Sequence, residues 1–252
     1  MNATAKKRFG QNFLNDEFVI AQIINLINPQ FDDFMVEIGP GRGALTHPLS
    51  ESLKQLHVIE LDRDIVKLLH NTQFAHPVII HSHDALKFDY TFKEKPQLRV
   101  AGNLPYNIST PLLFHLAQFD NITDMHFMLQ KEVVERICAS PNNKDYGRLS
   151  VMLQYRFNCI KLLDVSCNSF TPVPKVESAL IRLKPKPLNL WQHINEKKLN
   201  HIVTTAFNQR RKTITNSLKN LFDQDILASI GIDCKKRAEN LSVAEYVKLT
   251  TI

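Results

Sequence analysis

The part of the sequence best suited to chemistry is the tetrad Asn103-Leu104-Pro105-Tyr106. At the end of a strand, the Asn103 amide oxygen and the Leu104 carbonyl can accept hydrogen bonds from the two N–H groups of an amino-bearing ring. This would draw the nitrogen toward tetrahedral geometry and free its lone pair for attack. Pro105 would fix the turn, and Tyr106 would offer a stacking face worth about 1 to 3 kcal/mol for a base. The tetrad indicates an enzyme acting on a base, and the alternative is a strand-end turn with a half-buried tyrosine.

A glycine loop, Gly39-x-Gly41-x-Gly43, lies between an expected strand over 34–38 and an expected helix over 44–56. Glycine in such a loop lets the backbone approach a ligand without obstruction by a Cβ atom. The dinucleotide fingerprint would need a further glycine where the sequence has Ala44, so a pyrophosphate cofactor is less favoured. A tight turn that binds nothing is the alternative.

Two acidic residues suggest which cofactor the loop would serve. Glu60 ends the next expected strand, where a carboxylate can accept hydrogen bonds from both hydroxyls of a ribose. Asp84 could accept from an exocyclic adenine amine, although alone it would more often cap a turn. An adenosyl ligand without pyrophosphate suggests S-adenosylmethionine. Hydride transfer with NAD is less favoured because no paired acid and base accompanies the incomplete fingerprint.

Isolated histidines provide the other available bases. His57, His81 and His83 lie in or beside expected strands, where histidine is more often packed or at the surface than a ligand or general base. We therefore expect no metal site.

The order of apolar runs predicts an α/β fold with a mostly parallel sheet. Helical spacing over 17–27 and 63–70 alternates with short apolar runs, which indicates βαβ units. Later runs, joined by the proline-rich connection 171–174, are consistent with an antiparallel addition. Strands are expected at 34–38, 56–60, 78–80, 98–101, 125–130, 159–165 and 176–183. Ligands bind beyond the carboxyl ends of parallel strands, so the polar strand-end residues should gather in one cleft.

A domain boundary is expected at Lys184-Pro-Lys-Pro187, because its two prolines resist both helix and central strand. Residues 1–187 would form the catalytic, cofactor-binding domain, and 188–252 a small helical RNA-binding domain with helices over 197–221 and 224–249.

The charge balance points to a polyanionic partner. Lys and Arg number 31 against 25 Asp and Glu, a formal charge of +6, and the stretch from Arg182 to Arg237 carries 12 basic and 4 acidic residues. Nucleic acid is the leading candidate, and a solvated basic surface is the alternative.

The four cysteines and the N-terminus suggest the cytoplasm. Cys138, Cys159, Cys167 and Cys234 form no Cys-x-x-Cys pair, which is typical of reduced thiols. The N-terminus lacks the apolar core of a secretion signal, and no stretch approaches the roughly 18 apolar residues of a membrane span. We expect a cytoplasmic protein without a membrane partner.

Several motifs together resemble the ribosomal RNA adenine dimethyltransferases. The resemblance covers nearly the whole chain and is greatest to the KsgA (RsmA) group, the small-subunit enzymes. Its motifs are Gln11-Asn-Phe-Leu14, Glu37-Ile-Gly-Pro-Gly41, Glu60-Leu-Asp62, the tetrad 103–106, Phe170-Thr-Pro-Val-Pro-Lys-Val176 and Ala206-Phe-Asn-Gln-Arg-Arg-Lys212.

The resemblance implies a Rossmann-like class I methyltransferase fold, a mostly parallel seven-stranded sheet with an antiparallel strand, and a small α-helical C-terminal domain. It implies S-adenosylmethionine-dependent N6,N6-dimethylation of two adjacent adenosines near the 3′ end of 16S rRNA in the 30S subunit. A role in small-subunit biogenesis and a monomeric state are also expected.

The resemblance assigns roles residue by residue. The residues expected at the reacting base are Asn103, Leu104, Pro105, Tyr106 and Phe170, the last covering the base opposite Tyr106. The expected cofactor contacts are Gln11, Asn12, Leu14, Gly39, Gly41, Glu60, Asp62, Asp84 and Asn103. The expected RNA contacts are Arg210, Arg211 and Lys212, with Arg148 and Lys6-Lys7-Arg8 as weaker candidates.

Two other functions remain open from the sequence. The Erm type of adenine dimethyltransferase shares the tetrad and cofactor motifs but modifies large-subunit RNA; the segments 170–176 and 210–212 favour the small-subunit type. A noncatalytic RNA-binding or assembly factor with the same fold would be expected to have lost site residues, whereas Glu60, Asp84, Asn103 and Tyr106 are all present.

Overall fold

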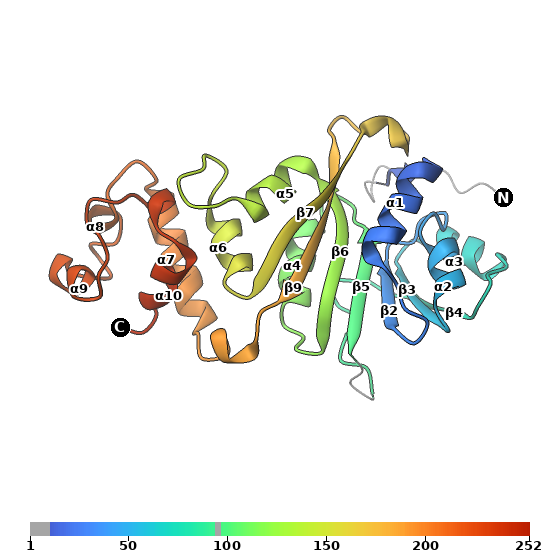
Figure 1. Cartoon of the computed structure of the whole chain (residues 1–252), viewed down its shortest axis with the longest axis horizontal. Helices are drawn as coiled ribbons and strands as arrows, with labels where there is room; N and C mark the ends of the chain where they lie inside the picture. The colour runs from blue at the N-terminus through green and yellow to red at the C-terminus, as the bar shows by residue number, and fades with distance from the viewer. Residues whose placement is uncertain (1–10, 94–96) are drawn as a thin grey trace. The chain divides into compact units, whose positions relative to one another are not determined.

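The structure, a computed structural model, describes residues 11–93 and 97–252. The chain forms two compact units (Figure 1). The first contains the residues up to Val134 and Ile160–Lys184, and the second contains Glu135–Cys159 and Pro185–Ile252. This division differs from the expected single boundary at residue 187, because the segment 135–159 groups with the C-terminal part.

The central element is a seven-stranded sheet with the strand order β4-β3-β2-β5-β6-β9-β7. The strands from β4 to β6 in that order are parallel, and β9 pairs antiparallel with β6. The predicted α/β class is therefore confirmed. The strands are β2 (Phe34–Ile38), β3 (Leu56–Glu60), β4 (Val78–Ser82), β5 (Leu98–Asn103), β6 (Ile122–Gln130), β7 (Phe157–Val165) and β9 (Ser178–Pro185).

Three helices of the first unit pack against one hydrophobic cluster with β2 and β3. The cluster contains Ile23, Leu49 and Ile65 from these helices beside Met35 and Val58 from the strands. Burial of this apolar surface holds the strand ends in place. The helices are α1 (Glu17–Ile27), α2 (Thr46–Ser52) and α3 (Arg63–His70), and the later part of the chain adds α4 (Ser109–Leu116) and α5 (Lys131–Cys138).

Helix α2 is shorter than the helix expected over 44–56. The preceding residues form turns in which Gly41 and Gly43 have φ values of +55° and +91°, so the helix begins only at Thr46. Strand β3 already begins at Leu56, which leaves no room for a longer helix.

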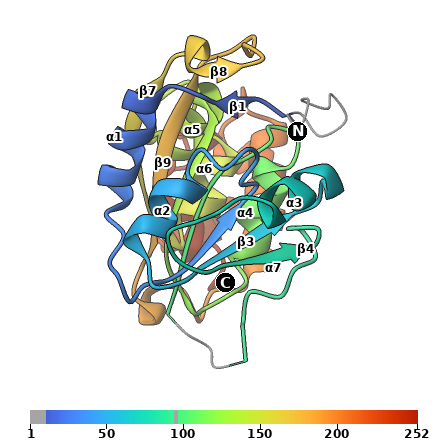
Figure 2. The ribbon, with the colours of Figure 1, turned by 90° about the vertical axis from the view of Figure 1, so that its right-hand side faces the viewer.

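A two-stranded antiparallel sheet joins the N-terminal segment to a distant part of the chain. Strand β1 (Phe13–Leu14) pairs with β8 (Phe170–Thr171), as Figure 2 shows. The Asn15 side-chain amide donates to Thr171 Oγ1 at 2.7 Å, and the Ser169 hydroxyl donates to Asp16 at 2.9 Å. Neither strand was predicted from the sequence, because two residues give no periodicity.

The second unit is helical, but apart from α7 its helices are short. The two long helices expected over 197–221 and 224–249 are interrupted, because Thr213 is extended and pairs with Arg237, and Gly231 has a φ of +79°. The helices are α6 (Arg148–Gln154), α7 (Glu196–Asn208), α8 (Ile214–Ser217), α9 (Gln224–Ser229) and α10 (Val243–Lys248). Short 3₁₀ turns occupy Cys167–Ser169, Leu188–Leu190 and Ala238–Asn240.

Within the described ranges, no helix combines the length and apolar character needed to cross a bilayer.

Candidate active site

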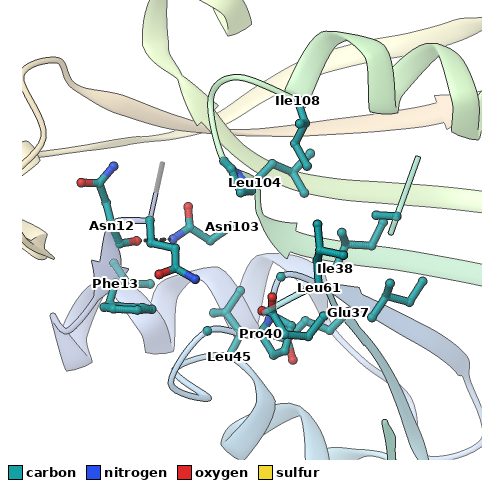
Figure 3. A pocket seen from close by; sticks show the side chains of 18 of the residues that line it. Asn12, Phe13, Glu37, Ile38, Pro40, Leu45, Leu61, Asn103, Leu104 and Ile108 are labelled. Atoms are coloured by element: carbon teal, nitrogen blue, oxygen red, sulfur yellow. Dashed lines mark hydrogen bonds between the residues drawn. The ribbon is translucent and has the colours of Figure 1, made fainter. Parts of the chain in front are cut away.

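A cavity of about 360 Å³ opens at the carboxyl ends of the parallel strands of the first unit (Figure 3). The loops after β2, β3 and β5, the residues after β4, and the N-terminal segment that contains β1 supply its walls. Most residues singled out from the sequence line it. They are Gln11, Asn12, Leu14, Gly39, Gly41, Glu60, Asp84, Asn103, Leu104, Pro105 and Tyr106.

Two expected site residues do not line the cavity. Asp62 is buried, caps α3 through the Asp64 N–H at 3.0 Å, and accepts a hydrogen bond from the Gln11 side chain at 3.2 Å. Phe170 is only 1% exposed and belongs to the hydrophobic cluster of the first unit. Asp62 therefore contacts a residue of the cavity wall, Gln11, and Phe170 is not among the residues that line the cavity.

The Asn103 side chain is oriented by the N-terminal segment. Its Nδ2 donates to the Asn12 carbonyl at 3.0 Å, the contact drawn as a dashed line in Figure 3. A carbonyl partner requires the nitrogen on that side, so the Oδ1 acceptor points elsewhere. The segment that contains β1 thus selects which end of this amide serves as an acceptor.

Tyr106, the last residue of the tetrad, also lines the cavity. Its hydroxyl hydrogen-bonds to the hydroxyl of Ser178 at 2.9 Å, and its main-chain carbonyl accepts from Ser109 at 3.1 Å. Partial burial raises the pKa of the Tyr106 phenol, although the bond with Ser178 opposes the shift. The ring is thus a neutral, anchored surface at neutral pH.

The glycine loop needs its glycines for conformation and for space. Gly39 and Gly41 have φ values of +67° and +55°, which L side chains rarely adopt. A Cβ atom on Gly41 would also lie 3.0 Å from the Phe13 ring. The glycine loop and the N-terminal segment therefore pack against each other in the cavity wall.

The two acidic residues proposed for an adenosyl ligand differ in surroundings. Burial raises the pKa of Glu60, and the Asp62 N–H donates to its Oε1 at 2.8 Å. Asp84 Oδ1 accepts from the Leu86 N–H at 3.0 Å, so this carboxylate caps a turn while it lines the cavity. One oxygen of Asp84 therefore caps a turn, as the alternative predicted, and the residue still lines the cavity.

A third carboxyl group, Glu37, lines the cavity and was not singled out as a contact from the sequence. Burial raises its pKa to about 8, and the nearby Glu60 adds to the shift. Its Oε2 is buried and, among the described residues, lacks a hydrogen bond of good geometry, although the nearby Thr46 hydroxyl opposes the pKa shift. A buried polar atom is costly to leave unsatisfied, so this oxygen fits a ligand that donates a hydrogen bond.

Sequence reasoning also missed apolar and cationic parts of the wall. Leu61 is 51% exposed directly after Glu60, and the Arg42 guanidinium lies 4.5 Å from the centre of the Phe13 ring. An exposed leucine beside a strand-end acid was the available signal, because a flat ring can cover it. Phe13 gave no signal, since only the pairing of β1 places it here.

The histidines behave as packed residues. His57 Nδ1 and His81 Nε2 lie 2.9 Å apart with stacked rings, and burial lowers the pKa of His57 to about 4. Of these three histidines, His83 is among the residues that line the cavity.

The expected RNA contacts lie in the second unit and are unevenly available. Arg210 donates to Glu239 at 2.6 Å and to the Lys144 carbonyl at 2.5 Å, so its guanidinium already has protein partners. Arg148 donates to the Asn200 side chain at 3.0 Å. Arg211 and Lys212 are exposed. The segment Lys6-Lys7-Arg8 lies outside the described residues.

Comparison with known proteins decides the family. The family model described as ribosomal RNA adenine dimethylase matches residues 2–252. This chain belongs to that family. Proteins of the family carry out the methyl transfer that the tetrad and the adenosyl site indicate, and the predicted methyltransferase class and S-adenosylmethionine cofactor are confirmed.

Two curated relatives are similar over nearly their whole length, and both are named ribosomal RNA small subunit methyltransferase A. The Chromobacterium violaceum protein is 53% identical over 245 residues, covering 97% of this chain and 94% of the relative. The Escherichia fergusonii protein is 55% identical over 250 residues, covering 97% and 92%.

Solved structures support the same fold. A dimethyladenosine transferase from Plasmodium falciparum superposes with a TM-score of 0.80 at 25% identity, covering 94% of this chain and 95% of that one. The 23S rRNA methyltransferase ErmE superposes with a TM-score of 0.77 at 23% identity, covering 95% and 98%. The predicted Rossmann-like class I methyltransferase fold is confirmed.

Proposed function

We propose that this chain transfers two methyl groups to N6 of each of two adjacent adenosines near the 3′ end of 16S rRNA. The names of the relatives at 53% and 55% identity support the small-subunit choice. The substrate would be the RNA within the 30S subunit, and the chain would act as a monomer in the cytoplasm during subunit biogenesis.

The observation that carries the proposal is the orientation of Asn103. With Nδ2 bound to the Asn12 carbonyl, its Oδ1 is the acceptor that can face an adenine amine. The Leu104 carbonyl would accept from the second N–H, and the Tyr106 ring would stack on the base. Because the amine is held by acceptors and needs no prior deprotonation, position replaces a strong base.

The cavity fits the methyl donor by its size and its polar groups. A volume of about 360 Å³ lies within the range of small-molecule sites, which is about 300 to 1,000 Å³. Glu60 would hold the ribose hydroxyls and Asp84 the adenine amine, while Leu61 would cover the adenine ring. The buried Glu37 Oε2 would accept a hydrogen bond from a donor group of the same ligand. When bound, S-adenosylmethionine supplies an electrophilic methyl group on a sulfonium.

The target base must leave any stacked helix before Tyr106 can contact it. A base inside a duplex cannot enter such a cavity, so the adenosine is extruded or already lies in a loop. Arg211 and Lys212 are the cations proposed to hold the phosphates around it, because both are exposed.

Methylation of isolated subunits tests the choice of RNA. Undermethylated 30S particles and 50S particles are incubated separately with the chain and S-adenosylmethionine, and primer extension locates the dimethylated positions. We expect two adjacent stops near the 3′ end of 16S rRNA and none in 23S rRNA. Modification of 23S rRNA alone would favour the Erm-type alternative, and RNA binding without modification would favour a noncatalytic assembly factor.

A further inference from the structure

Ser178 is a buried polar residue whose hydroxyl contacts Tyr106, the last residue of the tetrad. It is the first residue of β9, is 0% exposed, and pairs in register with Gln130 of β6. The adjacent main-chain bond from Lys131 N–H to the Glu177 carbonyl, 2.9 Å long, holds this end of the strand. The Ser178 hydroxyl therefore belongs to a residue of the central sheet and not to the loop that precedes it.

The hydroxyl of Ser178 meets the far end of the Tyr106 side chain at 2.9 Å. The other end of Tyr106 is fixed by the Ser109 hydroxyl, which donates to its main-chain carbonyl at 3.1 Å. A phenol oxygen lies on the long axis of the side chain, so a partner there fixes the direction in which the ring points.

We propose that Ser178 is a positioning residue that acts through the Tyr106 ring and chiefly supports the second methyl transfer to each adenosine. The inference rests on the proposed function. An unmethylated amine offers two N–H groups, one for Asn103 Oδ1 and one for the Leu104 carbonyl. A monomethylated amine offers one, so its orientation depends more on the stacked ring.

In each transfer the N6 lone pair forms the new N–C bond while sulfur keeps the electrons of the breaking S–C bond. The nitrogen then releases one proton to water, leaving the thioether and the methylated base. The second transfer repeats these steps on a nitrogen with one N–H, and a ring that can swing away would misplace this nitrogen. Geometry at the reacting atoms, not binding of the RNA, is therefore what Ser178 protects.

The ratio of monomethyladenosine to dimethyladenosine in digested 16S rRNA tests the inference. Ser178→Ala should slow the second transfer about fivefold, since about 1 kcal/mol of orientation is lost, and the first less than about twofold. Monomethyladenosine should accumulate while the KM for 30S particles stays near that of the unchanged chain. Ser178→Thr, which keeps the hydroxyl, should restore the ratio.

A double-mutant cycle separates positioning from a general structural effect. Tyr106→Phe removes only the partner hydroxyl and should produce the same accumulation, and the double variant should show no further change. The matched control is Ser50→Ala, which removes another buried serine hydroxyl, bonded to the His47 carbonyl at 2.7 Å in α2. It should leave the ratio unchanged.

An unchanged ratio in both single variants, or additive effects in the double variant, would overturn the inference. If Ser178→Ala does not fold, Tyr106→Phe alone still decides. Failure of the proposed function is distinct, because the unchanged chain would then form no dimethyladenosine.

Discussion

The sequence predicts both a cavity in the first unit and a basic surface in the second. In the structure, the residues predicted for the cavity lie together, whereas some of those predicted for the basic surface are bound to other protein groups. Eleven predicted residues line one cavity, whereas Arg210 and Arg148 of the second unit are bound to protein partners. The order of parallel strands forces strand ends together, so residues at those ends must meet. Basic residues in turns and short helices have no such constraint, because only local packing decides which cation remains available.

The largest effect is expected at the strand end itself. Asn103→Ala should lower the rate of methyl transfer about 10²- to 10³-fold, since an oriented polar group at the reacting atoms is lost. RNA affinity should change little. Single-turnover transfer of labelled methyl groups to 30S particles measures the rate.

Asn107→Ala is the matched control for that prediction, because Asn107 also lines the cavity but is exposed and lies beyond the tetrad. A comparable loss in both variants would mean that any change in the wall impairs transfer, and the specific role of Asn103 would be wrong.

Glycines of the two units should differ in the cost of an added methyl group. A Cβ atom on Gly102 of β5 would lie 2.3 Å from the Ile38 carbonyl oxygen of β2, whereas none of the described atoms lies within 4 Å of that on Gly147. Gly102→Ala should lower the free energy of unfolding by about 3 kcal/mol, and Gly147→Ala by less than about 0.5 kcal/mol. Chemical denaturation measures both free energies of unfolding. Equal losses would contradict the expectation that an added methyl group is costly in the sheet and nearly free in the helical unit.

Acid should lower the free energy of unfolding through protonation of His126. Burial lowers the pKa of this β6 side chain to about 4, against the opposing effect of nearby Asp124, and Arg99 and Arg182 reinforce the shift. Below its ordinary pKa near 6.5 the unfolded chain binds a proton that the folded chain does not. The free energy of unfolding should therefore fall as pH decreases from 6.5 to 4, by up to about 3 kcal/mol for this residue.

Chemical denaturation of the unchanged chain and of His126→Leu at several pH values measures this dependence. The variant should lose much of the slope between pH 6.5 and 4 and retain the part due to His57, whose pKa is also about 4. An identical slope in both proteins would contradict the assignment to His126.

The smallest effects should separate the cations of the second unit. Arg211→Ala and Lys212→Ala should each reduce the slope of log affinity against log salt for 30S binding by about 1. Arg210→Ala should leave that slope unchanged and cost at most about 1 kcal/mol of stability, because its partner Glu239 is at the surface. A reduced slope for Arg210 alone would reverse the ranking.

Much of the sheet was predictable because its strands are short apolar runs that end in glycine or polar residues. Helices α1 and α3 were also predicted with their bounds. The helix over 197–221 was not, since no sequence rule placed Thr213 in an extended pairing with Arg237.

Within the site, the sequence identified side chains but not their partners. The bond between Asn103 and Asn12 and that between Tyr106 and Ser178 each join residues more than 70 positions apart. Only the closed fold brings such pairs together. For Phe170, the motif predicts a place at the base. In the structure this side chain is buried in β8, which pairs with β1, and its role at the base stays a prediction.

The structure of the chain in complex with S-adenosylhomocysteine tests the central claim most directly, namely that one cavity at the strand ends holds the donor beside Asn103. We expect the ribose hydroxyls on the Glu60 carboxylate, the adenine amine on Asp84, and the sulfur end directed toward Asn103. A ligand bound outside this cavity, or within it but away from Glu60 and Asp84, would contradict the account.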